Sequence, residues 1–313
     1  NAYCMGSGMA VSKSFVIWAE RYLQNKHFGK HQECNTRCLI DKVTRFEDEH
    51  KHPMNIDSMT ADDLRVFADF LSSDYDISMN TIVTNMTLMR TVCNWVRKQG
   101  VTNNDPFFGY DMPKALYGTP YFLTIQERDQ VLDADLTDDA ELAEYRDMFV
   151  FQCMVGCRHS DLVTFTPKNI IDGVLEYIPI KTKGKLGDVV RVPLIPKAMA
   201  ILDGHDHGDD EPIFPKHYNF KFNDAIRRIL KRAKVNRVVT VINPKTRLEE
   251  KKPISDVATS HLARRTFIGN LYRMVKDPDL VASMSGHAKG SVAFARYRVI
   301  DDDMKKSLVE LIQ

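Results

Sequence analysis

Residues 286–297 read GHAKGSVAFARY, which places His287 directly after a glycine and Tyr297 ten residues later. The run between them has helical character, so Tyr297 is expected at the end of a short helix. A tyrosine hydroxyl is a poor nucleophile at neutral pH, because its unperturbed pKa is about 10. It becomes reactive where cationic groups and a histidine surround it. The sequence therefore predicts that Tyr297 is a covalent nucleophile, and the rest of the chain must supply those groups.

The overall composition is that of a soluble globular protein. The chain has 313 residues, of which 43% are hydrophobic and 27% are charged, enough for a core in each of two domains. No apolar run approaches the roughly 20 residues that span a bilayer, so no membrane partner is expected. The six cysteines do not form a disulfide framework, which predicts free thiols and a cytoplasmic location. The chain begins with Asn1 rather than Met, which leaves room for a longer natural protein.

The charges are unevenly distributed, although the formal net charge is only +1. The segment 127–147 holds nine acidic and two basic residues, and the segment 213–252 holds twelve basic and three acidic residues. Such segregation lets one face of a nearly neutral protein attract a polyanion.

The first 103 residues predict a small all-α domain. Four helices with apolar stripes are expected, at about 12–24, 30–47, 60–71 and 78–99. Thr60 is the predicted N-cap of the third helix, and Gly100 ends the fourth. The segment 104–120 contains repeated Pro, Gly and Asn residues and has no periodicity, so it is interpreted as a linker.

Residues 121–313 predict a second, mostly helical domain with a small β-sheet or hairpin. Thr124 and Glu127 form a predicted capping box at its first helix. Two β-rich runs, 174–180 and 189–194, flank a Gly/Lys loop and predict the hairpin. Helical patterns then continue to a C-terminal tail helix at about 302–312. The fold class expected for the whole chain is thus mainly α, with a minor β component.

Three further motifs carry charged groups that could act on a phosphate. Arg158 follows a helix break in the run GCRHSD, where Asp161 could both cap the next turn and hold the guanidinium. His261 and Arg264 are three residues apart and share a face of a predicted helix. Lys181 lies in the hairpin loop. Taken alone, each motif is more often an ordinary helix corner or a solvated basic surface than a catalytic site.

Taken together and in this order, the motifs resemble the tyrosine recombinase (phage integrase) family. Members carry Gly-x-Arg-x-Ser-Glu/Asp, a hairpin lysine, His-x-x-Arg, Gly-His or Gly-Trp, and a nucleophilic tyrosine. The matching positions are Arg158, Lys181, His261, Arg264, His287 and Tyr297. The resemblance covers about residues 12–312. It implies a core-binding domain at 1–103, a linker at 104–120, and a catalytic domain at 121–313 with a C-terminal tail helix.

The resemblance implies a site-specific DNA recombinase that cleaves and rejoins strands through a 3′-phosphotyrosyl intermediate. Arg158 and Arg264 would clamp the phosphate, because guanidinium groups match its oxygens and stay charged. His261 and His287 would bind the phosphate and help to move the tyrosine proton. The hairpin lysine, Lys181 or alternatively Lys183, would protonate the departing 5′ oxygen. Such an enzyme needs no metal, no ATP and no cofactor.

The implied partner is double-stranded DNA, bound by a homotetramer that is a monomer or weak oligomer without DNA. A predicted helix from Asn219 to Lys234 has an apolar side and a basic side. We expect its Lys221, Arg228 and Arg232, together with Lys183 of the hairpin loop, to contact phosphates. A merely solvated basic face is the alternative for this helix.

Two other functions are compatible with parts of the pattern. A type IB topoisomerase uses a similar set of residues but religates the same strand, and the separate helical domain argues against it. A non-catalytic architectural DNA-binding protein would have no use for Tyr297.

No metal site is expected, because the nearby histidines and cysteines match no closed zinc pattern. These residues are His27, His31, Cys34 and Cys38.

Overall fold

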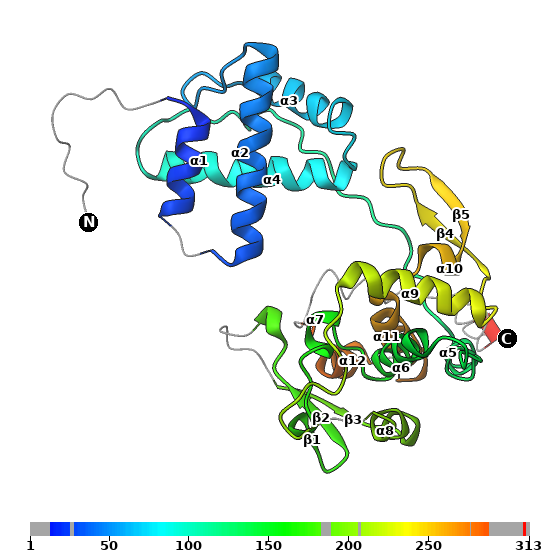
Figure 1. Ribbon diagram of the computed structural model, residues 1–313. Coiled ribbons are helices and arrows are strands. Elements are labelled where there is room, and N and C mark those ends of the chain that lie inside the picture. Colours follow the sequence, from blue (N-terminus) through cyan, green and yellow to red (C-terminus); the bar gives the residue numbers. More distant parts are fainter. Residues whose placement is uncertain are drawn as a thin grey trace. The chain divides into compact units, whose positions relative to one another are not determined.

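The computed structural model of the chain describes residues 13–25, 28–182, 189–205, 208–275, 277–287 and 309–310 (Figure 1). The chain divides into two compact units. The first comprises Asn1–Tyr117 and Ile242–Leu248, and the second comprises Gly118–Val241 and Glu249–Gln313. The boundary after Tyr117 falls within the segment 104–120, whereas the grouping of residues 242–248 with the first unit is not apparent from the sequence.

The described residues of the first unit form four α-helices. They are α1 (Phe15–Gln24), α2 (Lys30–His50), α3 (Ala61–Ser73) and α4 (Met79–Lys98). Thr60 caps α3 as predicted, since its side chain accepts from the Asp63 amide while Asp63 reaches back to the Thr60 amide. Aromatic rings fill the core between helices, and the ring of Phe46 lies 5.3 Å from that of Phe67 and 5.4 Å from that of Phe70. Edge-to-face ring pairs at such distances stabilise the helix contacts.

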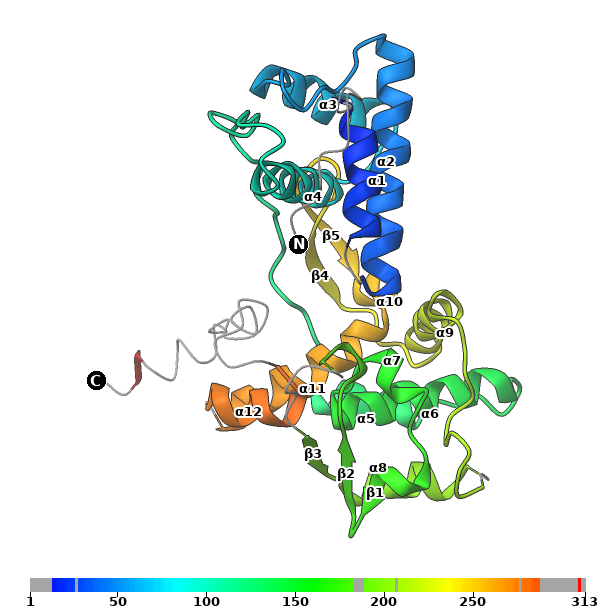
Figure 2. The same cartoon turned by 90° about the vertical axis from the view of Figure 1, so that its left-hand side faces the viewer.

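The second unit is also mainly helical. Its longer helices are α5 (Ile125–Leu132), α6 (Ala140–Val155), α8 (Pro196–Asp203), α9 (Asn219–Arg232), α11 (Ser260–Val275) and α12 (Pro278–Ser285), and its short ones are α7 (His159–Leu162) and α10 (Ile254–Val257). All residues of α6 from Met148 to Val155 are buried, so this helix forms the centre of the core. Helix α11 packs along α6, and α12 follows it next to β3 (Figure 2). The predicted capping box of Thr124 and Glu127 is present at the start of α5.

The predicted hairpin is confirmed as part of a three-stranded antiparallel sheet in the order β1-β2-β3. The strands are β1 (Ile170–Ile171), β2 (Val174–Tyr177) and β3 (Val190–Pro193), with Leu175 opposite Val192. Both of these side chains are buried, so one face of the sheet covers the helical core. Short 3-10 helices, η1 (Pro167–Asn169) and η2 (Ile180–Thr182), precede β1 and follow β2.

A second pair of strands, β4 (Val238–Ile242) and β5 (Glu249–Pro253), was not predicted. The sequence of β4, VVTVI, carries a β-branched signal. The sequence of β5, EEKKP, is charged and has low strand propensity, so its pairing with β4 rather than its own side chains makes it a strand.

Several sequence predictions lie outside the described residues. These are the placement of Tyr297 and Lys183 and most of the C-terminal tail helix, of which only residues 309–310 are described as helical. No helix in the described part of the chain is long and apolar enough to cross a membrane.

Candidate active site

The corner between α6 and α7 is built on Gly156. This residue ends α6 with a φ of 67°, a left-handed conformation that glycine adopts at little steric cost. A Cβ atom at this position would lie 2.2 Å from Cδ1 of Phe267, so the close approach also requires glycine. The side-chain amide of Gln152 donates to the Cys157 carbonyl at 3.0 Å, and this hydrogen bond stabilises the corner. The chain therefore turns here at a fixed angle and brings Arg158 to the start of α7.

Arg264 lies at the centre of the candidate site. It projects from α11 and its side chain is only 1% exposed. Its Nη1 donates to the Gly156 carbonyl at 2.7 Å, and its Nη2 lies 2.9 Å from Nδ1 and 3.1 Å from Nε2 of His287. Because a guanidinium group only donates, the nitrogen of His287 that it contacts must accept, which requires an unprotonated nitrogen. One arginine thus joins the corner after α6, helix α11 and the turn after α12.

The turn after α12 presents His287. Gly286 ends α12 with a φ of 63°, and the His287 amide donates to the Ala282 carbonyl at 3.1 Å. The hydroxyl of Ser285 lies 2.9 Å from Nδ1 of His287 and gives the ring a second polar contact. A sharp glycine turn and two side-chain contacts therefore fix the position of the imidazole.

The two histidines of the site are held in the neutral form. Desolvation, followed by the charge of Arg264 and that of Arg158, lowers the pKa of His287 to about 3. Desolvation of the ring and the charges of Arg265, Arg264 and Arg158 lower the pKa of His261 to about 4, although its side chain reaches the surface. The shared causes place both imidazoles in the field of the same guanidinium groups. Neutral imidazoles can each accept one hydrogen bond and donate another.

Arg158 is half-buried at the N-cap position of α7, and no described residue accepts a hydrogen bond from its guanidinium group. The expectation that Asp161 holds Arg158 is wrong. The Asp161 side chain is 1% exposed and its Oδ1 accepts from the Ile180 amide at 2.9 Å. The carboxylate therefore binds the backbone next to Lys181, at a sequence separation of 19 residues. Nothing in the motif GCRHSD indicated that partner.

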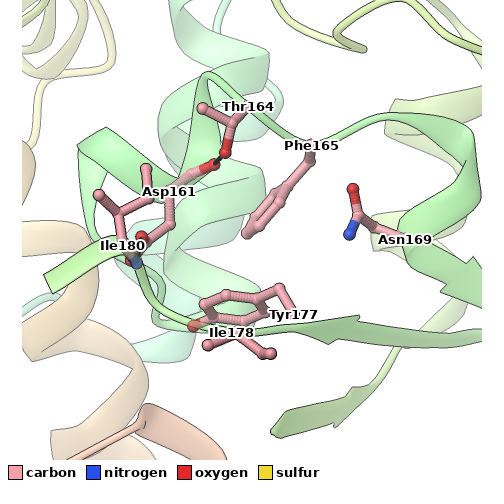
Figure 3. A pocket seen from close by; sticks show the side chains of 7 residues that line it. All are labelled: Asp161, Thr164, Phe165, Asn169, Tyr177, Ile178 and Ile180. Atoms are coloured by element: carbon pink, nitrogen blue, oxygen red, sulfur yellow. Dashed lines mark hydrogen bonds between the residues drawn. The ribbon is translucent and has the colours of Figure 1, made fainter. Parts of the chain in front are cut away.

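Asp161 also lines a pocket of about 410 Å³ beside β2 (Figure 3). Phe165, Tyr177 and Ile180 form its apolar walls, and Oδ2 of Asp161 has no hydrogen-bond partner among the described residues. Burial, with a contribution from Cys157, raises the pKa of the Tyr177 hydroxyl above its usual value. Tyr177 is therefore kept protonated, and sequence analysis did not single it out.

Lys181 lies in η2, the next element after β2, and its side chain is exposed. Its charge is among the causes that lower the pKa of His287, which indicates that Lys181 lies near that histidine. The structure thus brings together Arg158, Lys181, His261, Arg264 and His287 from segments that are far apart in the sequence. Lys183 and Tyr297, the other two residues considered for catalysis, lie outside the described residues.

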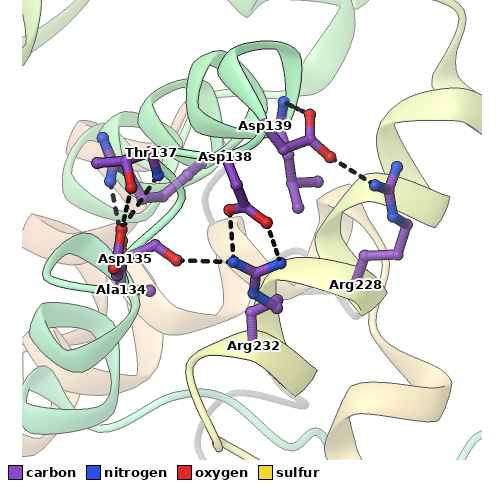
Figure 4. A network of polar contacts seen from close by, with 9 residues as sticks. Ala134, Asp135, Thr137, Asp138, Asp139, Arg228 and Arg232 are labelled. Carbon is purple, nitrogen blue, oxygen red and sulfur yellow. Dashed lines mark hydrogen bonds and ion pairs between the residues drawn. The ribbon is translucent and has the colours of Figure 1, made fainter.

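The basic helix α9 has a different environment from the one expected. Arg228 donates to Asp139 at 2.7 Å, and Arg232 makes two bonds to Asp138 at 2.6 and 3.1 Å (Figure 4). These carboxylates belong to the acidic segment 127–147, so the two oppositely charged segments partly neutralise each other. A phosphate would have to compete with the carboxylates for either arginine. The predicted phosphate contacts of Arg228 and Arg232 therefore remain a prediction.

Lys221 is exposed on the same helix and has no ion-pair partner among the described residues.

The five cysteines in the described part of the chain are free thiols. In that part, no group of three or more His, Cys, Asp or Glu side chains is arranged to hold a metal ion.

Comparisons with known proteins agree with the architecture. The model of the phage integrase family matches residues 121–304, and that of the phage integrase SAM-like domain matches residues 14–112. No curated protein matches the sequence significantly. Among solved structures, an integrase of the Tn1549 transposon in complex with a circular intermediate DNA has a TM-score of 0.71 at 15% identity, covering 96% of this chain and 100% of that chain. A lambda integrase dimer bound to a COC' core site has a TM-score of 0.67 at 14% identity, covering 91% of this chain and 95% of that chain. These structural matches share the two-unit fold.

Proposed function

This chain belongs to the phage integrase family, the tyrosine-type site-specific recombinases, and we propose that it cuts and rejoins DNA strands with Tyr297 as nucleophile. One observation supports the roles given to these residues: Arg264 contacts both the Gly156 carbonyl and the His287 ring. That contact assembles the cationic and imidazole groups of three separate motifs around one point. A phosphodiester bound there would meet all of them.

The arginines would supply the positive charge for the reaction. Attack on a phosphodiester increases the negative charge on its nonbridging oxygens, and Arg158 and Arg264 would neutralise it. Burial of Arg264 strengthens this effect, because electrostatic interactions are larger where water is excluded. The bonds to Gly156 and His287 fix the guanidinium plane before DNA binds. Because the guanidinium groups carry the charge, the proposed reaction uses no metal ion and no cofactor.

Proton movement would involve the two histidines and the lysine. The hydroxyl of Tyr297 attacks phosphorus, the bond from phosphorus to the 5′ oxygen breaks, and a 3′-phosphotyrosyl bond forms. His261 and His287 would hydrogen-bond the phosphate and help to move the tyrosine proton. Lys181 would protonate the departing 5′ oxygen, with Lys183 as the alternative. Attack of a 5′ hydroxyl from a second duplex reverses the step, so no ATP is needed.

The proposed partner is duplex DNA, which a homotetramer would bind during strand exchange, with a monomer or weak oligomer in its absence. Both solved integrases described above were bound to DNA, which supports this partner.

The free thiols of the described cysteines support a reducing compartment, and we place the protein in the cytoplasm. A type IB topoisomerase and an architectural DNA-binding protein are not favoured by the family to which the chain belongs.

A nicked suicide substrate tests the nucleophile. The probe is a duplex selected from a random pool by the wild-type protein, with a nick placed at successive positions so that cleavage releases the 5′ hydroxyl fragment. The wild-type protein should give a covalent band on a denaturing gel, and Tyr297→Phe should bind the same duplex without forming that band. Tyr272→Phe is the matched control, because Tyr272 lies on α11 outside the proposed chemistry. A covalent band from Tyr297→Phe would reject the assignment.

A further inference from the structure

Two aromatic side chains at the start of α9 are exposed. Tyr218, the N-cap residue, is 75% exposed, and Phe220 is 68% exposed. Their rings stack with centroids 6.0 Å apart and an interplanar angle of 25°. The other large apolar side chains of α9 are buried in the core of the second unit, namely Phe222, Ile226, Ile229 and Leu230. The amphipathic pattern of the helix is therefore broken only at its first turn, where two rings face outward together.

This first turn is fixed to the candidate active site. The Ser260 amide donates to Oδ1 of Asn223 at 2.7 Å, and the Ser260 hydroxyl donates to Oδ1 of Asn219 at 3.0 Å. Ser260 directly precedes His261 in the sequence. The exposed rings are thus held close to one of the groups that would bind the phosphate.

The neighbour of Arg158 makes a second contact with this end of α9. The ring of His159 lies 5.1 Å from that of Phe222, with an interplanar angle of 30°. Both the Arg158 motif and the His261 motif therefore touch the first two turns of α9. The exposed pair Tyr218 and Phe220 therefore lies on the same end of α9 that both motifs contact.

The charge around the rings fits a polyanion. Lys216 and Lys221 flank the aromatic pair, both are exposed, and neither has an ion-pair partner among the described residues. Farther along the helix, Arg228 and Arg232 are paired with carboxylates. The positive charge of α9 that is not matched by a carboxylate therefore lies at its N-terminal end.

We propose that Tyr218 and Phe220 contact the C5-methyl groups of thymines in the major groove of the DNA held at the active site, and so select the sequence beside the cleaved bond. This inference rests on the proposed function. The phenyl ring of Phe220 can neither donate nor accept a strong hydrogen bond, so it cannot read a phosphate or a polar base edge. In a stacked duplex the base faces are covered, and the thymine methyl is the apolar group displayed in the major groove. An α-helix fits that groove, and its first turn is the part that reaches deepest when the helix enters end-on.

The test compares sequence preference with and without the rings. Wild-type protein and Phe220→Ala each select duplexes from a random pool, and the enriched bases are read at every position. We expect wild type to enrich thymine at one or two positions near the cleaved bond and Phe220→Ala to lose the enrichment at the position that Phe220 contacts. Replacing those thymines by deoxyuridine, which removes only the methyl group, should weaken wild-type binding about fourfold per methyl and weaken binding by Phe220→Ala less, because only the Tyr218 ring then remains. Tyr218→Phe keeps its ring and should keep the preference.

The comparison has two controls. Ile171→Ala removes another exposed apolar side chain of the same unit and should leave the preference unchanged. Melting temperatures should be equal for all variants, because the substituted side chains are exposed. Equal sensitivity of wild type and Phe220→Ala to deoxyuridine would overturn the proposal. So would loss of self-association by Phe220→Ala with an unchanged thymine preference, since the rings would then contact a second protein chain. The covalent band of wild type on the nicked duplex reports separately on the proposed function.

Discussion

Substitution of Gly156 by alanine tests the packing on which the candidate site depends. The φ of 67° costs a non-glycine residue about 1–2 kcal/mol. In addition, the new methyl group would lie 2.2, 2.7 and 2.9 Å from three atoms of the Phe267 ring, so the ring or the helix must move. Overpacking of this kind typically costs about 1–3 kcal/mol. The predicted loss of unfolding free energy for Gly156→Ala is therefore about 2–5 kcal/mol.

Gly173→Ala isolates the contribution of the clash. Gly173 has a φ of 73° and lies in the same unit, but a Cβ atom there meets nothing within 4 Å. This control should lose only the conformational cost of about 1–2 kcal/mol. For a unit of this size, 1 kcal/mol corresponds to about 2–4 °C in melting temperature. Gly156→Ala should therefore melt about 2–12 °C below the control.

Two spectroscopic signals separate the units in the full chain. Both tryptophans, Trp18 and Trp95, lie in the first unit, so tryptophan fluorescence reports on that unit alone. Near-ultraviolet circular dichroism and calorimetry report on the unfolding of both units, so a transition absent from the fluorescence belongs to the second unit. The fluorescence midpoint should stay unchanged in both variants. Equal melting of Gly156→Ala and Gly173→Ala would refute the reasoning, because it would mean that Phe267 yields to the methyl group without cost.

Three further predictions concern the charged groups. Arg264→Lys should slow formation of the covalent adduct by about 10²–10³, because an ammonium group cannot reproduce the guanidinium fork; an unchanged rate would exclude Arg264 from the phosphate clamp. The pKa of His287 is lowered to about 3, below the 6.5 or so of an unfolded chain, so the unfolded state binds the extra proton as the pH falls. The melting temperature should accordingly decrease from about pH 6.5 downward, and less steeply in His287→Gln; equal slopes would contradict the neutral imidazole. Lys221→Ala should reduce the slope of log affinity against log salt by about one, while Arg232→Ala, whose charge is matched by Asp138, should reduce it less. An equal reduction would mean that Arg232 releases Asp138 to bind phosphate.

The local signals in the sequence predicted most of the helices and their ends. Thr60 and Thr124 cap helices as expected, and the helix break expected before Arg158 is the end of α6 at Gly156, because caps and left-handed glycines act within one turn of the chain. Strand β5 escaped prediction for the opposite reason. Its residues are charged, and only pairing with β4 makes the segment extended.

The partners of charged side chains were not predictable in the same way. Asp161 was expected to hold Arg158, which is near in sequence, and instead binds the Ile180 amide. Arg228 and Arg232, which are predicted to contact phosphates, also bond to carboxylates 89 and 94 residues away, and nothing in the sequence indicated those ion pairs. Hydrogen bonds and ion pairs form between groups that folding brings together, and a charge pattern along the chain does not contain that information.

The sequence by itself determined the family and the identity of the groups available for chemistry, because residue types and their order are local properties. Only the tertiary structure decided how they are held. It buries Arg264 and bonds it to the Gly156 carbonyl 108 residues away and to His287 23 residues away. It also matches the C-terminal arginines of α9 with carboxylates while leaving Tyr218 and Phe220 exposed at its start. The physical reason is that burial and electrostatic pairing depend on which helices pack together, and that packing is set by the whole core rather than by any one motif.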